Sequence, residues 1–263
     1  MTATIHEHSS VLNRVPEVTV DFWLIKVMAV TMGETAADYL AVNLGLGLTV
    51  TSLIMTGVLV VALVLQFAQR RYVPWAYWLA VVLISVVGTL VTDNLVDNFG
   101  VRLETTTIAF SILLALTFVV WYAYEKTLSI HTIFTTRREI FYWLAILFTF
   151  SLGTAAGDLV AESFDMGYLT TGLIFGGVIA LIALAYYFVG LNSILAFWLA
   201  YILTRPLGAS FGDLLSQPVE YGGLGFGTTS TSLIFLGCII ALVVFMTLKA
   251  SADEADEILI ETD

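Results

Sequence analysis

Eight long apolar stretches dominate the sequence and restrict the folds that are open to it. Each is close to the ~20 residues that an α-helix needs to cross about 30 Å of hydrocarbon. Because lipid offers no hydrogen-bond partners to an exposed backbone, stretches of this length should be helices. The sequence therefore predicts an all-α polytopic membrane protein with eight transmembrane helices. They cover residues 22–41, 48–68, 76–96, 104–124, 140–160, 168–190, 194–215 and 228–248.

The composition agrees with a chain that lies mostly in lipid. Of the 263 residues, 59% are hydrophobic and only 12% are charged, whereas a soluble domain has about 25% charged residues. The strands of an outer-membrane barrel would show about 10 residues of alternating polarity. Unbroken runs such as Ile54–Leu65 do not fit that pattern. The lipid bilayer is therefore the one partner that the composition requires.

Basic residues between the predicted helices indicate the orientation of the chain. Seven lie on the side that holds both termini, and Arg102 alone lies in the loops of the other side. Cytoplasmic loops carry an excess of Lys and Arg, so both termini are expected in the cytoplasm. The seven are Arg14, Arg70, Arg71, Lys126, Arg137, Arg138 and Lys249.

The predicted organisation has five parts. A cytoplasmic N-terminal segment, 1–21, precedes a first half of four helices, 22–124. A cytoplasmic linker, 125–139, leads to a second half of four helices, 140–249. The acidic C-terminal tail, 250–263, is most simply a solvated end.

An internal repeat underlies the two halves. An aromatic residue followed by Trp and Leu opens the first, third, fifth and seventh predicted helices, with Trp-to-Trp intervals of 55, 65 and 55 residues. A glycine follows each Trp by ten residues, and an aspartate follows each glycine by five. The simplest explanation is a duplicated duplication of a two-helix unit. The matching residues are Trp23, Trp78, Trp143 and Trp198; Gly33, Gly88, Gly153 and Gly208; and Asp38, Asp93, Asp158 and Asp213.

Each member of this pattern has an expected role. The tryptophans should anchor the helices at the cytoplasmic interface, where the ring is apolar and the indole N–H stays wet. Another small residue stands four positions after each glycine, and such pairs let helices pack closely in lipid. At 1.5 Å per residue, each aspartate lies about 22 Å deeper than its Trp, near the outer end of the hydrocarbon.

The four aspartates in one register are candidate ligands of a small cation. All two-helix units cross the membrane in the same sense, so they should be related by pseudo-symmetry about its normal, giving a ring of four carboxylates. Carboxylate rings attract cations, and oxygen ligands suit hard divalent metals or a proton. The alternative is a structural role, such as capping the adjacent helix.

Three further ionisable residues within the predicted helices break this symmetry. Lys26 is near enough to the cytoplasmic end to extend its ammonium to water. Glu34 and Arg205 differ by about 6 Å in depth, measured from Trp23 and Trp198, so they can pair if their helices meet. Pro206 removes a backbone donor beside Gly208 and is a candidate kink.

Hydroxyl residues open the second helix of each unit, among them Thr51, Thr106, Thr171 and Thr231. They predict either N-capping and bonding to the preceding turn or a hydroxyl lining for a hydrated vestibule.

No catalytic motif argues for an enzyme, and no cofactor is expected. A Gly-x-Gly-Asp protease motif is incomplete at Asp158 and Asp213, because residues 155 and 210 are Ala and Ser. His6, His8 and His131 lie outside the predicted helices, and no Walker loop or basic nucleic-acid face is present. The prediction is a transporter or channel for a cation or another small solute; the alternative is a non-transporting scaffold or sensor partner.

The four aromatic–Trp openings, each followed by Gly and Asp at fixed spacing, resemble a family of uncharacterised bacterial membrane proteins with four tandem two-helix repeats. The resemblance covers about residues 22–248. It implies a location in the cytoplasmic membrane of a bacterium or archaeon, and it implies no activity.

Overall fold

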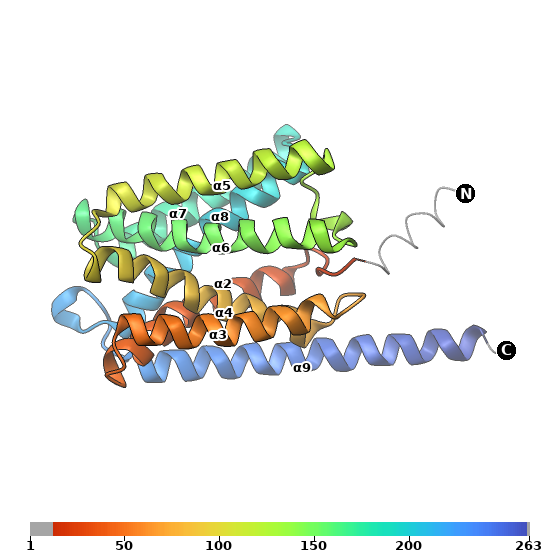
Figure 1. The fold of residues 1–263 in the computed structure, drawn as a ribbon, viewed down its shortest axis with the longest axis horizontal. Coiled ribbons are helices and arrows are strands. Elements are labelled where there is room, and N and C mark those ends of the chain that lie inside the picture. Colours follow the sequence, from red (N-terminus) through yellow and green to blue (C-terminus); the bar gives the residue numbers. More distant parts are fainter. Residues whose placement is uncertain (1–12, 262–263) are drawn as a thin grey trace.

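The computed structural model describes the backbone of residues 13–261 and the side chains of residues 13–249. Eight long helices and no strand are found in this part of the chain, as the apolar stretches predict. The first helices of the four repeats are α2 (Val20–Asp38), α4 (Pro74–Asp93), α6 (Thr136–Asp158) and α8 (Ser193–Ser216). The second helices are α3 (Leu48–Phe67), α5 (Leu103–Glu125), α7 (Gly167–Leu184) and α9 (Thr228–Glu261). They run side by side along the long axis of the molecule (Figure 1).

Seven of these helices are long and apolar enough to cross a membrane: all but α2. The exception carries Asp21, Lys26, Glu34 and Asp38 among its 19 residues. Its hydropathy is therefore low, although it lies inside the bundle.

The four first helices form a closed ring, because α2 packs on α4, α4 on α6, α6 on α8, and α8 on α2. Glycines make the close contacts. A Cβ on Gly33 would collide with Ser85, one on Gly88 with Phe150, one on Gly153 with Arg205, and one on Gly208 with Val30. In each case the residue opposite lies seven positions after the Trp of the next repeat in the ring. The repeated glycine is thus the point at which neighbouring repeats meet.

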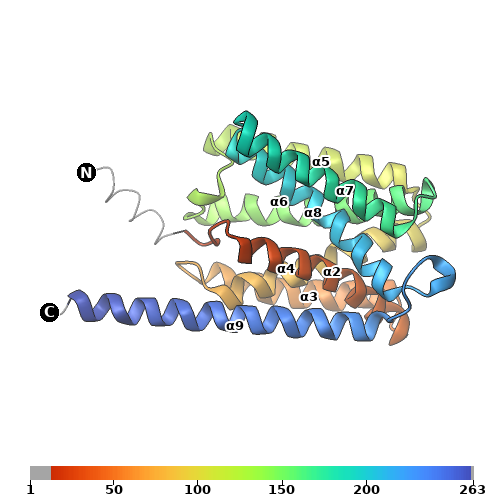
Figure 2. The same ribbon diagram turned by 180° about the vertical axis from the view of Figure 1, so that it is seen from behind.

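Each second helix packs mainly on the first helix of the following repeat. The pairs are α3 with α4, α5 with α6, α7 with α8, and α9 with α2. The two helices of one repeat contact each other chiefly where the second helix passes the C-terminal end of the first. The contact of α9 with α2 joins the last repeat to the first, and Figures 1 and 2 show α9 running along that side of the bundle.

A π-helical turn follows the aspartate directly in three repeats. These turns are Tyr39–Asn43, Asn94–Asn98 and Leu159–Ser163, and they begin at the residue after Asp38, Asp93 and Asp158. Short π-helical segments are rare and occur often at functional sites. In the fourth repeat α8 continues past Asp213 to Ser216.

The hydroxyls that open the second helices bond to the turn before them. Thr51 donates to the carbonyl of Gly47, and Thr106, Thr171 and Thr231 do the same to the residue four positions earlier. This is the local bonding expected of Thr at the start of a helix.

The tryptophans differ from the expected interface anchors. Trp78, Trp143 and Trp198 are at most 4% exposed, and only Trp23 is half-buried. Their indole N–H groups donate within the protein: Trp198 to the carbonyl of Leu128 at 2.9 Å and Trp78 to the hydroxyl of Tyr72 at 3.2 Å. Since the ring of helices closes around them, protein groups take the place that interfacial water would have filled.

The segment before α2 is held to the same end of the bundle as the linker between the halves. The backbone N–H of Arg14 donates to the carbonyl of Ile133, and its guanidinium pairs with Glu139 at 2.7 Å. Residues 1–12, with His6 and His8, lie outside the described part of the chain. At the other terminus, the predicted tail boundary at residue 250 falls within α9, which continues as a helix to Glu261.

Candidate functional site

A buried ion pair lies at the centre of the helix ring. Nη2 of Arg205, on α8, is 2.8 Å from Oε2 of Glu34, on α2. The Arg205 side chain is fully buried and that of Glu34 is 7% exposed. The pair joins the fourth repeat to the first, as the similar depth of the two residues allows. Such a pair is favourable only when hydrogen bonds complete it, because both ions have left water.

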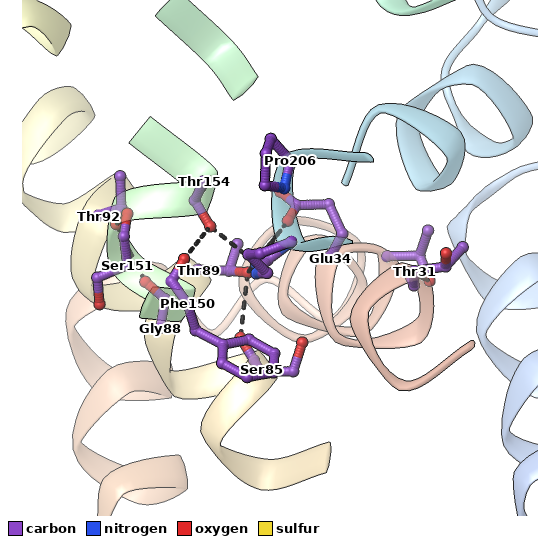
Figure 3. Close-up of polar contacts among 12 residues, drawn as sticks. Thr31, Glu34, Ser85, Gly88, Thr89, Thr92, Phe150, Ser151, Thr154 and Pro206 are labelled. Atoms are coloured by element: carbon purple, nitrogen blue, oxygen red, sulfur yellow. Dashed lines mark hydrogen bonds and ion pairs between the residues drawn. The ribbon is translucent and has the colours of Figure 1, made fainter. Parts of the chain in front are cut away.

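Two threonines complete the surroundings of the guanidinium. Nη2 of Arg205 donates to Oγ1 of Thr89 and, at 2.7 Å, to Oγ1 of Thr154, and the Thr89 hydroxyl donates to Glu34 at 3.2 Å. Glu34, Thr89 and Thr154 each stand eleven positions after the Trp of their own repeat. The fourth residue of this layer is Ala209. Figure 3 shows Glu34, Thr89 and Thr154 turned toward one another from three helices.

All four aspartates lie in one register beyond the layer that holds Glu34. Asp38, Asp93, Asp158 and Asp213 each stand four residues, about one helical turn, after that layer. Asp38 also accepts a hydrogen bond from Nε2 of Gln217 at 3.2 Å. Five carboxylates therefore belong to two adjacent layers of the ring, and among the described residues the ion pair found there is that of Glu34 with Arg205.

The carboxylates are not arranged like the ligands of a metal. Within the described residues, no three His, Cys, Asp or Glu side chains are placed so that they could hold a metal ion. The described residues thus include no ready-made divalent-metal site among these carboxylates.

Lys26 lies elsewhere than expected: it is fully buried, so the prediction that its ammonium reaches water is wrong. Its Nζ lies 4.1 Å from the centre of the Phe150 ring and 4.2 Å from that of Tyr201. The side chain thus points into the ring, toward Phe150 of α6 and Tyr201 of α8. Aromatic faces attract a desolvated cation, but more weakly than a carboxylate does.

A cavity of about 530 Å³ lies beside the carboxylates at the surface of the same end. Its lining includes Glu162, Asp165, Tyr168, Gln217 and Tyr221. Gln217 connects the cavity to Asp38 through the hydrogen bond described above. The cavity therefore gives solvent access to within one side chain of the cluster.

The sequence pattern marked Glu34, Arg205 and the aspartates as candidates but did not mark Thr89 and Thr154, which the structure places beside the ion pair. The signal was present, because residues at the same offset from the tryptophans form one layer of the ring. The polar residues of this site stand seven or eleven positions after a Trp of the repeat.

These features define the class of protein: a multi-pass helical membrane protein of four two-helix repeats closed around a buried ion pair. The chain belongs to the family described as Repeat of Unknown Function (DUF347), which matches residues 22–72, 76–127, 141–191 and 196–251. Each match covers one repeat, so the sequence repeat and the family repeat coincide. No curated protein and no solved structure matches the chain.

Proposed function

We propose that the protein is a membrane transporter or channel that moves a proton, another cation or a small solute along the axis enclosed by α2, α4, α6 and α8. In this proposal α2 is the eighth transmembrane helix. The four repeats are related by a pseudo-fourfold axis along the membrane normal, which the cyclic glycine contacts support. Both termini are cytoplasmic, in the inner membrane of a bacterium or archaeon.

The observation that carries the proposal is the imbalance of charge in the ring. The ring helices carry five carboxylates toward this end, Glu34 and the four aspartates, of which Glu34 pairs with Arg205, and each uncompensated charge deep in a membrane costs about 2.5–3.5 kcal/mol. Carboxylates in this situation take up protons or cations. Because the described residues form no group suited to a metal ion, binding of protons fits the geometry better than binding of a divalent cation.

The ion pair supplies an element with two states. When Glu34 is ionised, it holds Arg205 and so joins α2 to α8. When Glu34 takes a proton, that attraction is lost and the joint between the first and fourth repeats weakens. Uptake of a proton would in this way be coupled to opening of the ring at one joint.

Proteoliposomes containing an internal pH indicator test the proposal. An imposed pH gradient should collapse faster with the wild-type chain than with a variant carrying Asp→Asn at positions 38, 93, 158 and 213. Glu220→Gln, an exposed acid outside the ring, is the matched control. A parallel experiment with Mn²⁺ and a metal-sensitive dye separates cation transport from proton transport. Equal proton and Mn²⁺ flux in the wild type and the fourfold variant would remove the aspartates from the mechanism.

One observation favours the alternative of a scaffold or sensor partner. Figures 1 and 2 show α9 projecting past the other helices toward its end at Glu261. A helix that extends from the bundle is a surface for another protein. Truncation after Lys249 that leaves flux intact but abolishes a growth phenotype of the full chain would favour this role.

A further inference from the structure

A cavity of about 680 Å³ lies where α2 and α8 begin, at the opposite end of the bundle from the 530 Å³ cavity beside Gln217. Its walls come from α2, α7, α8 and the linker between the two halves. Figure 2 shows these three helices together on the near side of the bundle. The lining includes Trp23 of α2, Ile179 of α7, and Phe197 and Ala200 of α8. The cavity therefore borders the joint between the first and fourth repeats.

Equivalent residues of the second helices show why the space is open at this joint. Eight positions after the threonine that opens the helix, three repeats bury a residue that is only 4–5% exposed: Leu59, Leu114 and Ile239. The equivalent residue of α7, Ile179, is partly exposed and lines the cavity. Seven positions further on, Gln66 and Trp121 are fully buried, whereas Tyr186 is 41% exposed. The second half of α7 therefore leaves open a space that its counterparts fill.

The first half of α7 lies close to α8 through glycines. A Cβ on Gly172 would lie 3.7 Å from Ser210, and one on Gly176 would lie 3.6 Å from Leu207. Over its membrane-spanning window, however, α7 buries only 6% of its residues, against 17% for α3 and 22% for α5 and α9. Of the four second helices, α7 is thus the one with the most surface free for another molecule.

The lining of the cavity changes from polar to apolar along the helix axis. Ser193, at the start of α8, and His131, in the linker, lie at the end of the bundle. Ala200 stands seven residues after Ser193, and Ile179 seven residues before Tyr186, so both lie about 10 Å deeper. A membrane lipid has the same order of chemistry, with its headgroup at the interface and its acyl chains in the hydrocarbon.

We infer that the cavity holds the acyl region of one phospholipid molecule, with the headgroup at the start of α8. Both α7 and α8 are long and apolar enough to cross a membrane, so the cavity opens toward hydrocarbon. Association in lipid depends on packing, and a chain in this space supplies the contacts that Ile179 and Tyr186 lack. The first turn of α8 contains no acidic residue, and the N-terminal end of a helix favours an anion such as phosphate. The site goes beyond the proposed function and does not depend on it.

The dimensions of the cavity favour a lipid over a helix from a second copy of the chain. Spread over a depth of about 10 Å, the volume corresponds to a cross-section of about 70 Å². An α-helix with its side chains, about 10–12 Å wide, needs roughly 80–110 Å². Flexible acyl chains have no such minimum width, so they can fill the space between Trp23 and Ile179.

Native mass spectrometry of the purified full chain measures lipid binding directly. The chain is delipidated in detergent and titrated with a phosphatidylglycerol that carries two oleoyl chains, and free oleate serves as the comparison ligand. The wild type should bind one phosphatidylglycerol at least about tenfold more tightly than any further molecule, a difference of about 1.4 kcal/mol. Oleate, which lacks the phosphate and the second chain, should bind more weakly than this first phospholipid.

Variants that fill the cavity decide whether the tight binding occurs there. Ala200→Trp places a large side chain in the space and should weaken the first binding event by about tenfold or more. Ala123→Trp adds the same ring on the exposed face of α5 and should bind as the wild type does. If Ala200→Trp does not fold, Ala183→Trp, on the exposed wall that α7 contributes, takes its place with the same expected loss.

Four outcomes overturn the phospholipid site. They are a wild type without a tight first binding event, equal affinity in the wild type and the cavity-filling variant, oleate that binds as tightly as phosphatidylglycerol, and a dimer of the chain that forms without bound lipid.

Discussion

Substitution of Glu34 by Gln tests whether the ion pair is the main bond between the first and fourth repeats. The change leaves the shape of the side chain but removes its charge, so Arg205 stays buried without a counter-ion. Breaking a buried pair in this way costs about 3–5 kcal/mol. Two facts place the expected loss near the lower end. Arg205 keeps its hydrogen bonds to Thr89 and Thr154, and the aspartates one turn beyond the Glu34 layer no longer have its negative charge nearby. We expect Glu34→Gln to lower the free energy of unfolding by about 3 kcal/mol.

A double-mutant cycle separates the pair from its surroundings. Arg205→Met alone leaves Glu34 without its cation and should also cost about 3–5 kcal/mol, whereas the double variant buries neither charge and should recover most of the loss. Unfolding in mixed micelles with a denaturing detergent, followed by tryptophan fluorescence, measures all three. Glu220→Gln should stay within about 0.5 kcal/mol of the wild type, as expected for an exposed side chain. Additive losses in the double variant, or a Glu34→Gln variant as stable as the control, would refute the reasoning.

Two further substitutions test the packing of the ring. Gly208→Ala should destabilise the chain by about 1–3 kcal/mol, because the added Cβ would lie 2.8 Å from Cβ of Val30; Gly237→Ala, where nothing lies within 4 Å, should be close to neutral in the same unfolding assay. Trp198→Phe should cost about 1 kcal/mol, since the part-buried carbonyl of Leu128 loses its donor. If Gly208→Ala and Gly237→Ala unfold at the same free energy, Gly208 is not needed for close approach of the helices. If Trp198→Phe is as stable as the wild type, the indole N–H does not stabilise this end of the bundle.

Periodicity predicted the helices and the register of the repeats, because both depend on residues close in the chain. The depth of each residue followed from its distance to the tryptophan, and this placed Glu34 and Arg205 at compatible levels. Which helices would be neighbours could not be read in the same way. The packing of α9 on α2 joins residues about 200 apart and depends on the geometry of the whole ring.

The burial of Lys26 and of three of the repeat tryptophans has one physical cause. The predictions for Lys26 and for the tryptophans assumed that a residue one turn inside a membrane helix has water within reach. The aromatic residues that precede the tryptophans close this end of the ring, as the 2.6 Å contact between the hydroxyls of Tyr77 and Tyr142 shows. Water is excluded there, so Lys26 meets aromatic rings and the indoles bond to protein. Sequence position gives depth, but it does not tell whether a helix face is turned toward the axis or the surface.

The polar core is asymmetric although four similar repeats build the ring. The residue at one position of the repeat accounts for most of this asymmetry. Seven positions after the tryptophans, three repeats have Val30, Ser85 and Phe150, whereas the fourth has Arg205. Its long side chain reaches the next layer, where Glu34, Thr89 and Thr154 are polar and the residue of its own helix, Ala209, is small. A larger side chain at 209 would compete for the space that the guanidinium fills. The alanine is thus the complement of the arginine, and the charge pair at the joint of the first and fourth repeats distinguishes that joint from the other three, which is why the proposed mechanism assigns proton uptake to it.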